Sequence, residues 1–165
     1  MKLESMVDTD RQPLILSSLV DTLLVSHAER AAQQQIQLSG EGIAGLPEIS
    51  GHPAQMLRAL QEILRNALQH TEPGGRVTVS GQVEAAQVVI TITDTGSGIS
   101  AEHIPRVFDR FYRVEQYRPL EDAHTGLGLS IAKKVIELHG GTITLDSAIQ
   151  QGTTVKITLP VTPPG

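Results

Sequence analysis

Three short segments contain side chains whose chemistry and spacing suit a binding site. The first is EILRNALQH, in which Glu62, Asn66 and His70 recur every four residues. On a helix this spacing places all three side chains on one stripe. Asparagine is a mediocre helix former, and its amide oxygen is a good ligand for Mg²⁺, so the stripe is a candidate metal site. An amphipathic helix also exposes a polar stripe to water, and the residues alone leave both interpretations open.

The second segment, DTGSGI, directly follows the alternating strand pattern VVITIT. A carboxylate such as that of Asp94, at the end of a buried strand, can accept a hydrogen bond from an exocyclic amine. Gly96 and Gly98 allow the backbone to take positive φ and to approach a flat ring closely. An adenine fits this description, although a plain strand-to-loop turn also favours Asp and Gly.

The third segment, HTGLGLS, lies where a helix is expected to begin, near Leu127. Gly126 and Gly128 leave the first backbone N–H groups uncovered, and a helix N-terminus offers positive potential to phosphate oxygens. The segment has neither the Lys-Ser or Lys-Thr of a P-loop nor the third glycine of a dinucleotide fingerprint. A lone G-x-G is weak evidence, but an amide for Mg²⁺, a carboxylate for adenine and a glycine-opened helix for phosphates together form the parts of one nucleotide site.

The elements that must position these segments follow from apolar periodicity, which predicts three helices over 13–35, 53–70 and 127–139. A shorter helix is expected over 101–107. Short strands are expected within 36–50, an antiparallel hairpin in RVTVSGQV and QVVITITD, and a second strand pair in TITLDSA and TTVKITLP. We therefore predict an α+β fold, a two-layer α/β sandwich in which three helices cover one face of a mixed, mostly antiparallel sheet.

Length and composition limit the class of protein. The 165 residues with 39% hydrophobic content suit one domain. A net charge of -5 argues against a nucleic-acid partner, and the absence of Cys excludes disulfides and Cys-based zinc sites. All aromatic residues lie in one segment, as Phe108, Phe111, Tyr112 and Tyr117. Aliphatic side chains must therefore build the core, and the aromatic cluster is either a small satellite core or a docking surface.

The order ILRNALQHT, DTGSGI, FDRFYR, GLGLS, HGGTI and GTTVKITLP resembles the ATP-binding catalytic domain of sensor histidine kinases, within the wider fold shared with DNA gyrase and mismatch-repair ATPases. The resemblance covers about residues 13–160. It implies that 1–12 is a remnant of a preceding dimerisation-domain helix or a linker. It also implies a histidine kinase-like ATPase fold with a mobile ATP lid over about 106–125. Phe108 and Phe111 match the family's F box, so the resemblance assigns the aromatic cluster to the lid and a docking surface. The proline-rich composition of 161–165 predicts a disordered tail.

The resemblance also implies a role for each candidate site residue. Asn66 would hold Mg²⁺, Asp94 would contact the adenine amine, and Arg113, after the aromatic pair of the F box, would reach the γ-phosphate. Glu62 and Arg113 are then the catalytic candidates. The implied cofactor-binding residues, for ATP and Mg²⁺, are Asn66, His70, Asp94, Gly96, Gly98, Gly126, Leu127 and Gly128.

The function implied is transfer of the γ-phosphate of Mg²⁺-ATP to a histidine on a separate dimerisation or phosphoacceptor domain, in two-component signal transduction with a response regulator. None of the six histidines lies in a phosphoacceptor context, so the chain is expected not to phosphorylate itself. We expect a monomeric, cytoplasmic fragment, and membrane anchoring of its full-length receptor stays open.

Three residues depart from the family pattern. Gln69 stands where the family usually has Lys, which should weaken phosphate binding, and His124 stands where it has a glycine, which should stiffen the lid hinge. Glu62 stands where the family often has Asn. Two alternatives therefore remain: a gyrase-type ATPase with Glu62 as general base for water, and a nucleotide-sensing module that never transfers phosphate.

Overall fold

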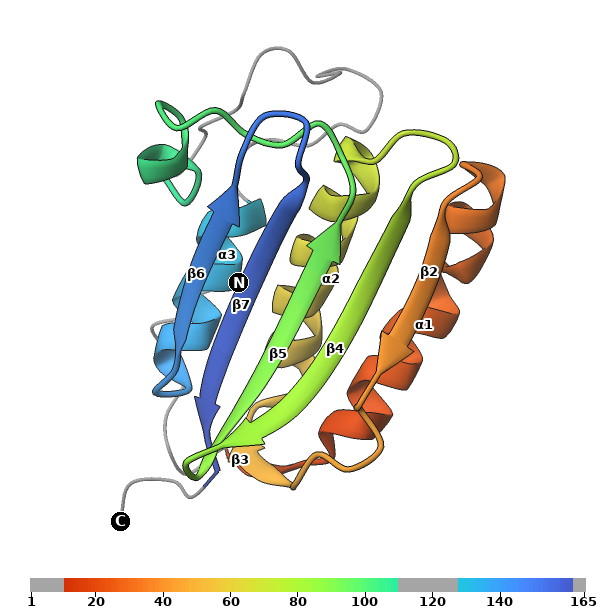
Figure 1. Ribbon diagram of the computed structural model, residues 1–165. Coiled ribbons are helices and arrows are strands. Elements are labelled where there is room, and N and C mark those ends of the chain that lie inside the picture. Colours follow the sequence, from red (N-terminus) through yellow and green to blue (C-terminus); the bar gives the residue numbers. More distant parts are fainter. Residues whose placement is uncertain (1–10, 110–127, 162–165) are drawn as a thin grey trace.

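The computed structural model describes residues 11–109 and 128–161 (Figure 1). In chain order, the elements in these ranges are β1 (Gln12–Leu14), α1 (Leu16–Gln33), β2 (Gln37–Glu41), β3 (Ile49–Gly51), α2 (Pro53–His70), β4 (Arg76–Glu84), β5 (Gln87–Asp94), the 3₁₀ helix η3 (Ile104–Arg106), α3 (Gly128–Leu138), β6 (Thr142–Ser147) and β7 (Thr153–Pro160).

The main sheet has the strand order β2-β4-β5-β7-β6. Strand β2 is parallel to β4, and the other three strand pairs are antiparallel. Helices α1, α2 and α3 all lie on one face of this sheet (Figure 1). The predicted two-layer α/β sandwich with a mixed, mostly antiparallel sheet is therefore confirmed.

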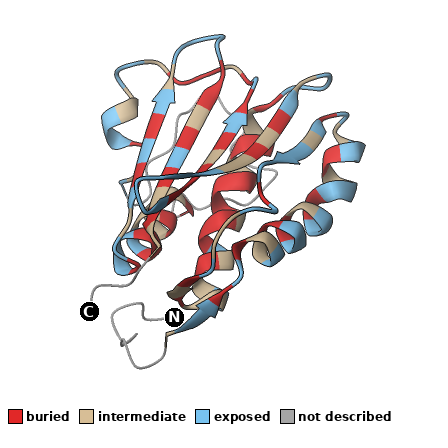
Figure 2. Ribbon diagram, turned by 60° about the horizontal axis from the view of Figure 1, so that its bottom comes forward, coloured by how far each residue is buried: buried red, intermediate tan, exposed pale blue. Residues whose placement is uncertain are grey.

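The core lies between the sheet and the three helices. Strands β5, β7 and β6 contribute side chains in register, so that Ile92, Val155 and Leu145 form one buried row. Because side chains alternate across a strand, the next residues point to the open face, where β6 exposes Thr144 and Asp146. Figure 2 shows this alternation as bands of buried and exposed residues along the strands.

The elements that carry the three polar segments meet at one end of the sheet, where β5 and β6 finish and β7 begins. Helices α2 and α3 pack against each other and run in opposite directions, so the end of α2 and the start of α3 lie at the same end of the sheet. Strand β5 also ends there, and β6 and β7 are joined there by a turn (Figure 1). The fold therefore brings together the first segment, the second segment and the described part of the third, which begins at Gly128, although they are far apart in the sequence.

Two predicted helices differ from the structure near a proline. The first begins at Leu16 instead of residue 13, because residues 12–14 form β1, in which Pro13 pairs with Ser50 of β3. Proline fits this two-stranded ribbon because an edge strand can lack an N–H donor.

The helix expected over 101–107 is only the three-residue η3. Pro105 has no N–H to donate to the carbonyl four residues earlier, and its ring would clash with that carbonyl. The backbone instead forms hydrogen bonds to the carbonyl three residues earlier, such as Arg106 N–H to His103 O at 2.9 Å. The segment after β5 therefore turns without extending into a helix.

Candidate functional site

The loop after β5 is held between the end of α2 and the β6–β7 turn. The N–H of Ser97 donates to the carbonyl of His70 at 3.4 Å, and the N–H of Gln150 donates to the carbonyl of Ser97 at 2.6 Å. Two of the predicted segments, EILRNALQH and DTGSGI, are therefore in direct contact.

Asp94, the last residue of β5, is a buried carboxylate with 4% of its surface exposed. Its Oδ1 accepts the N–H of Gly96 at 2.8 Å, and the N–H of Thr153 also donates to the carboxylate. Burial raises the pKa of Asp94 from 3.8 to about 6, against the smaller opposing effect of these two hydrogen bonds. No Lys or Arg of the described ranges forms an ion pair with it. Because a carboxylate offers about four lone pairs, acceptor capacity remains for a ligand.

Gly96 and Gly98 are required by contacts of the loop with the rest of the protein. A Cβ at Gly96 would lie 2.2 Å from the carbonyl oxygen of His70. At Gly98, where φ is +78°, it would lie 1.9 Å from the carbonyl oxygen of Ala148. The sequence reasoning attributed these glycines to the approach of a flat ring. That role stays a prediction, and the structure adds a second reason, because the protein's own backbone lies where a Cβ of either residue would stand.

The predicted polar stripe of α2 is mostly withdrawn from solvent. Glu62 is 6% exposed, and its Oε2 pairs with Nε of Arg58 at 3.2 Å and with Nη1 of Arg65 at 3.9 Å. Asn66 and His70 are half-buried, one and two turns further toward the loop. For Glu62 the interpretation as a solvated helix face is therefore wrong, and the helix end that carries the stripe contacts the loop after Asp94.

Several predicted site residues lie outside the described residues. These are Arg113, Gly126 and Leu127, together with Phe111, His124 and most of the expected lid. Gly128 is described, as the buried first residue of α3.

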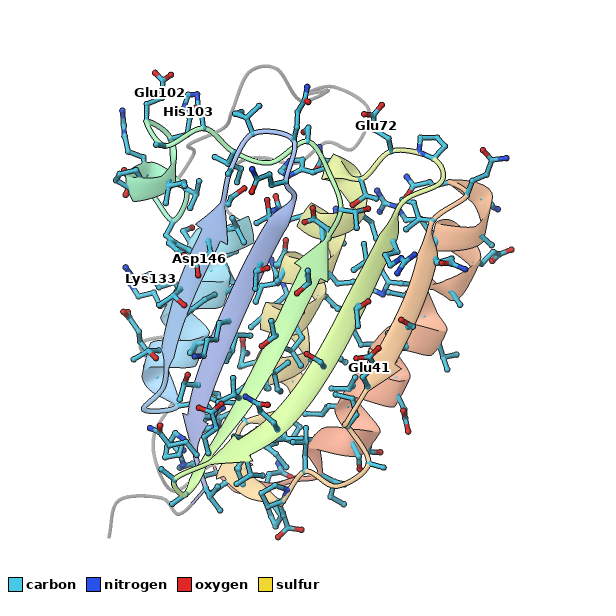
Figure 3. All side chains as sticks on the ribbon, viewed as in Figure 1. Glu41, Glu72, Glu102, His103, Lys133 and Asp146 are labelled. Atoms are coloured by element: carbon cyan, nitrogen blue, oxygen red, sulfur yellow. The ribbon has the colours of Figure 1, made fainter. Side chains whose placement is uncertain are left out.

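The first residues of the expected lid, 106–109, are described, and Phe108 among them lies beside α3. Phe108 is half-buried against the core, and the ammonium of Lys133 lies 5.6 Å from the centre of its ring. Figure 3 shows Lys133 on α3, with Glu102 and His103 higher on the same side of the molecule, in the segment after the Asp94 loop. The described aromatic residue therefore packs at the margin of the main core, with Lys133 over its ring.

The sequence reasoning did not identify two polar residues beside Asp94. Thr153 is 3% exposed and pairs with Asp94 across β5 and β7, and Ser147 pairs with Thr153 across β6 and β7. A signal was present in the alternation of the two strands. Both residues stand at positions that would otherwise continue the inward-facing apolar series of β6 and β7.

The residues present fit a nucleotide and a magnesium ion. A buried carboxylate bound only by backbone N–H groups suits a ligand amino group. Among the described residues, no group of three or more His, Asp or Glu side chains could hold a metal ion. A cation at the amide oxygen of Asn66 would therefore need phosphate and water oxygens for its other positions, as Mg²⁺ commonly has in nucleotide sites. No helix of the described part is both long and apolar enough for a bilayer span.

Comparison with known proteins gives consistent matches. The profile of a family described as histidine kinase-, DNA gyrase B-, and HSP90-like ATPase matches residues 51–163. Sensor histidine kinase RppB of Synechocystis sp. is 35% identical over 88% of this chain, which spans 32% of that protein's length.

Two solved structures are also similar. The catalytic domain of histidine kinase ThkA matches 93% of this chain and 99% of its own, with a TM-score of 0.80 at 22% identity. The mycobacterial sensor histidine kinase MprB matches 93% of this chain and 99% of its own, with a TM-score of 0.76 at 29% identity. Both solved structures therefore have the histidine kinase-like ATPase fold expected for this chain.

Proposed function

Because this chain belongs to the histidine kinase-, DNA gyrase B-, and HSP90-like ATPase family, we propose that it is the ATP-binding catalytic part of a sensor histidine kinase. It binds Mg²⁺-ATP and presents the γ-phosphate to a histidine on a separate domain. The observation that carries this proposal is the buried carboxylate of Asp94, which has unused acceptor capacity beside the end of α2. The similarity to RppB, a sensor histidine kinase, supports the same function.

In this proposal each end of the nucleotide has its own residues. Asp94 accepts the amino group of adenine, and the loop with Gly96 and Gly98 holds that carboxylate in place. His70 makes a polar contact at the end of α2. Asn66 holds Mg²⁺, which neutralises phosphate charge when bound. The backbone N–H groups of Gly128, the first residue of α3, and of Gly126 and Leu127, which precede it in the sequence, would be the donors to the triphosphate.

The reaction is a displacement at phosphorus in which an imidazole nitrogen of the partner domain forms the new P–N bond. The bond from the γ-phosphorus to the β,γ-bridging oxygen breaks, and ADP leaves. This chain contributes positioning and charge neutralisation, with Arg113 at the γ-phosphate, and no nucleophile of its own is needed. A response regulator then receives the phosphate. A solved complex of histidine kinase ThkA with response regulator TrrA supports a partner of this kind.

The gyrase-type alternative has less support. It requires Glu62 to accept a proton from water, yet two arginines share that carboxylate. In the kinase mechanism Glu62 orients the incoming imidazole, and the arginine pairs restrict its side chain.

Two measurements test the proposed function. Calorimetric titration should show ATP binding that is tighter with Mg²⁺ than with EDTA. Incubation with γ-labelled ATP should leave the isolated chain unlabelled and should label a separately supplied dimerisation domain from the same receptor. That labelling should be slow, because the covalent link that raises effective concentration is absent. Rapid hydrolysis that Glu62→Ala abolishes, with no transfer to the supplied domain, would establish the gyrase-type ATPase instead. ATP binding with neither transfer nor hydrolysis would indicate a nucleotide-sensing module.

A further inference from the structure

A row of polar residues crosses three neighbouring strands at the end of the sheet, next to the loop that follows Asp94. The strand register aligns Asp94 of β5 with Thr153 of β7, and Thr153 with Ser147 of β6. All three residues have the strand parity of the buried row formed by Ile92, Val155 and Leu145, so they lie on the helix-facing side. The last row before the proposed nucleotide site is therefore polar.

The hydroxyl of Ser147 is saturated with hydrogen bonds. Its Oγ lies 2.7 Å from the backbone N of Ile99, 2.8 Å from the carbonyl oxygen of Gly152 and 2.8 Å from Oγ1 of Thr153. A serine hydroxyl has one proton and two lone pairs. The N–H of Ile99 can only donate and the carbonyl of Gly152 can only accept, so Ser147 donates to Gly152. Thr153 must therefore donate its own proton to Ser147.

This arrangement determines what Thr153 can offer to its other neighbour. Its backbone N–H already donates to the carboxylate of Asp94. Its hydroxyl proton points to Ser147, so the hydroxyl has only lone pairs left for Asp94 or for a ligand. The side chains of Asp94 and Thr153 therefore offer only acceptors, and no side-chain donor of the row uses the remaining lone pairs of Asp94.

We propose that Ser147 is a positioning residue that sets the base specificity of the nucleotide site, because it holds the hydroxyl proton of Thr153 away from Asp94. Side-chain oxygens that can only accept hydrogen bonds suit an exocyclic amino group, as in adenine, and repel a carbonyl oxygen, as in guanine. This inference rests on the proposed function. Ser147 touches no substrate in this role, since it acts through Thr153 and through the end of the loop at Ile99.

The substitution Ser147→Ala tests this role. Without its acceptor, the hydroxyl of Thr153 can turn to the carboxylate of Asp94, where it competes with the adenine amine, or can donate to a guanine carbonyl. We expect ATP affinity to fall and the ratio of ATP to GTP affinity to decrease about tenfold, which is the scale of one mispaired buried polar group. Ser147→Thr keeps the hydroxyl and should restore the ratio.

Matched variants separate this effect from a loss of stability. Thr144→Ala removes a hydroxyl from the exposed face of the same strand and should leave the ratio unchanged. In a Thr153→Val background there is no hydroxyl to release, so adding Ser147→Ala should no longer alter the ratio. Should Ser147→Ala fail to fold, Ser147→Cys replaces it, because a thiol is a weak acceptor and should shift the ratio in the same direction.

The outcomes distinguish this inference from the proposed function. A parent chain that binds neither ATP nor GTP would overturn the proposed function, and this inference with it. A parent that prefers ATP while Ser147→Ala weakens ATP and GTP equally would overturn the specificity role alone. The same conclusion would follow if Ser147→Ala changed the ratio as much in the Thr153→Val background as in the parent.

Discussion

Replacing Asp94 with asparagine should remove a loss of stability that the ligand-free domain undergoes as pH rises to neutral, and it should weaken the binding of ATP. The carboxylate is 4% exposed, and its pKa is raised from 3.8 to about 6 because burial disfavours the charged form. The two values differ by roughly 2.2, and at about 1.4 kcal/mol per pH unit the ionised group costs the folded state about 3 kcal/mol. The substituted amide would carry no charge and would avoid this cost.

The effect should have a defined pH window. The pKa of Asp94 is higher in the folded chain than in the unfolded chain, so the native state binds the proton more tightly. The stability that the protonated group contributes is complete below pH 3.8 and is lost as pH rises through about 6. The variant does not titrate at this position. The unfolding free energy of the variant minus that of the parent should therefore increase by about 2–3 kcal/mol between pH 4 and pH 7.

The assay is urea unfolding of parent and Asp94→Asn at intervals from pH 4 to pH 8, followed by circular dichroism. The neutral amide is a weaker acceptor than the carboxylate for the N–H groups of Gly96 and Thr153, which adds a penalty that is constant with pH. The slope of the difference with pH is therefore the informative quantity. Asp146→Asn makes the same charge change at an exposed position of β6 and controls for net charge.

Two results would refute this reasoning about Asp94. The first is a difference in unfolding free energy that stays flat from pH 4 to pH 8, since the burial of Asp94 would then have no energetic effect on its ionisation. The second is unchanged ATP affinity in the variant at pH 7.5, where loss of a charged acceptor should cost about tenfold or more. The second result would remove Asp94 from the nucleotide site.

The remaining predictions concern the loop and α2. Gly98→Ala should lower the unfolding free energy by more than about 2 kcal/mol, because φ is +78° and Ala148 O would lie 1.9 Å from the new Cβ. Gly74→Ala, with φ of +92° and nothing within 4 Å, should cost only about 1 kcal/mol, so equal losses in urea unfolding would contradict the clash. Asn66→Ala should weaken ATP binding in Mg²⁺ and have little effect in EDTA, and calorimetry that shows equal losses in both would argue against a metal ligand. Glu62→Ala should slow single-turnover transfer to the supplied acceptor with little change in ATP affinity, and a parallel loss of both would assign Glu62 to binding.

The fold could be predicted where the periodic pattern was long enough. Strands β4 to β7 alternate over six to nine residues, and α2 keeps an apolar face over five turns. Strand β1 has only three residues, and its partner β3 lies about 35 residues further along the chain. A three-residue pattern has no measurable period, and Pro13 also suits the first turn of a helix. The sequence therefore predicted a helix start where tertiary pairing forms a strand.

The candidate site was predictable to the extent that each segment has its own local chemistry. Asp94 and Asn66 became candidates because a carboxylate at the end of a buried strand and an asparagine within a helix each suit a ligand, and the resemblance to a family gave each of them a role. The role of Gly98 could not be identified, because the clash that requires it is with Ala148, about fifty residues away. Ser147 and Thr153 become part of the site only through the register of β6 and β7 with β5. Such contacts exist only after the chain has folded.

The polar row also explains how the fold tolerates a buried charge. The row formed by Asp94, Thr153 and Ser147 is followed directly by an apolar row, so the carboxylate lies in a medium of low polarity, which raises its pKa and strengthens any hydrogen bond that it accepts. The two effects have one cause, and a residue that binds an amine more strongly there must also reduce the stability of the empty domain. Backbone N–H groups of Gly96 and Thr153 offset part of this cost. The hydroxyl of Thr153 does not offset more of it, because that hydroxyl donates its proton to Ser147 instead of Asp94. If Thr153 could donate to Asp94, the free domain would gain stability and the ligand would lose an acceptor. The hydrogen-bond pattern of this row therefore favours binding over the stability of the ligand-free domain.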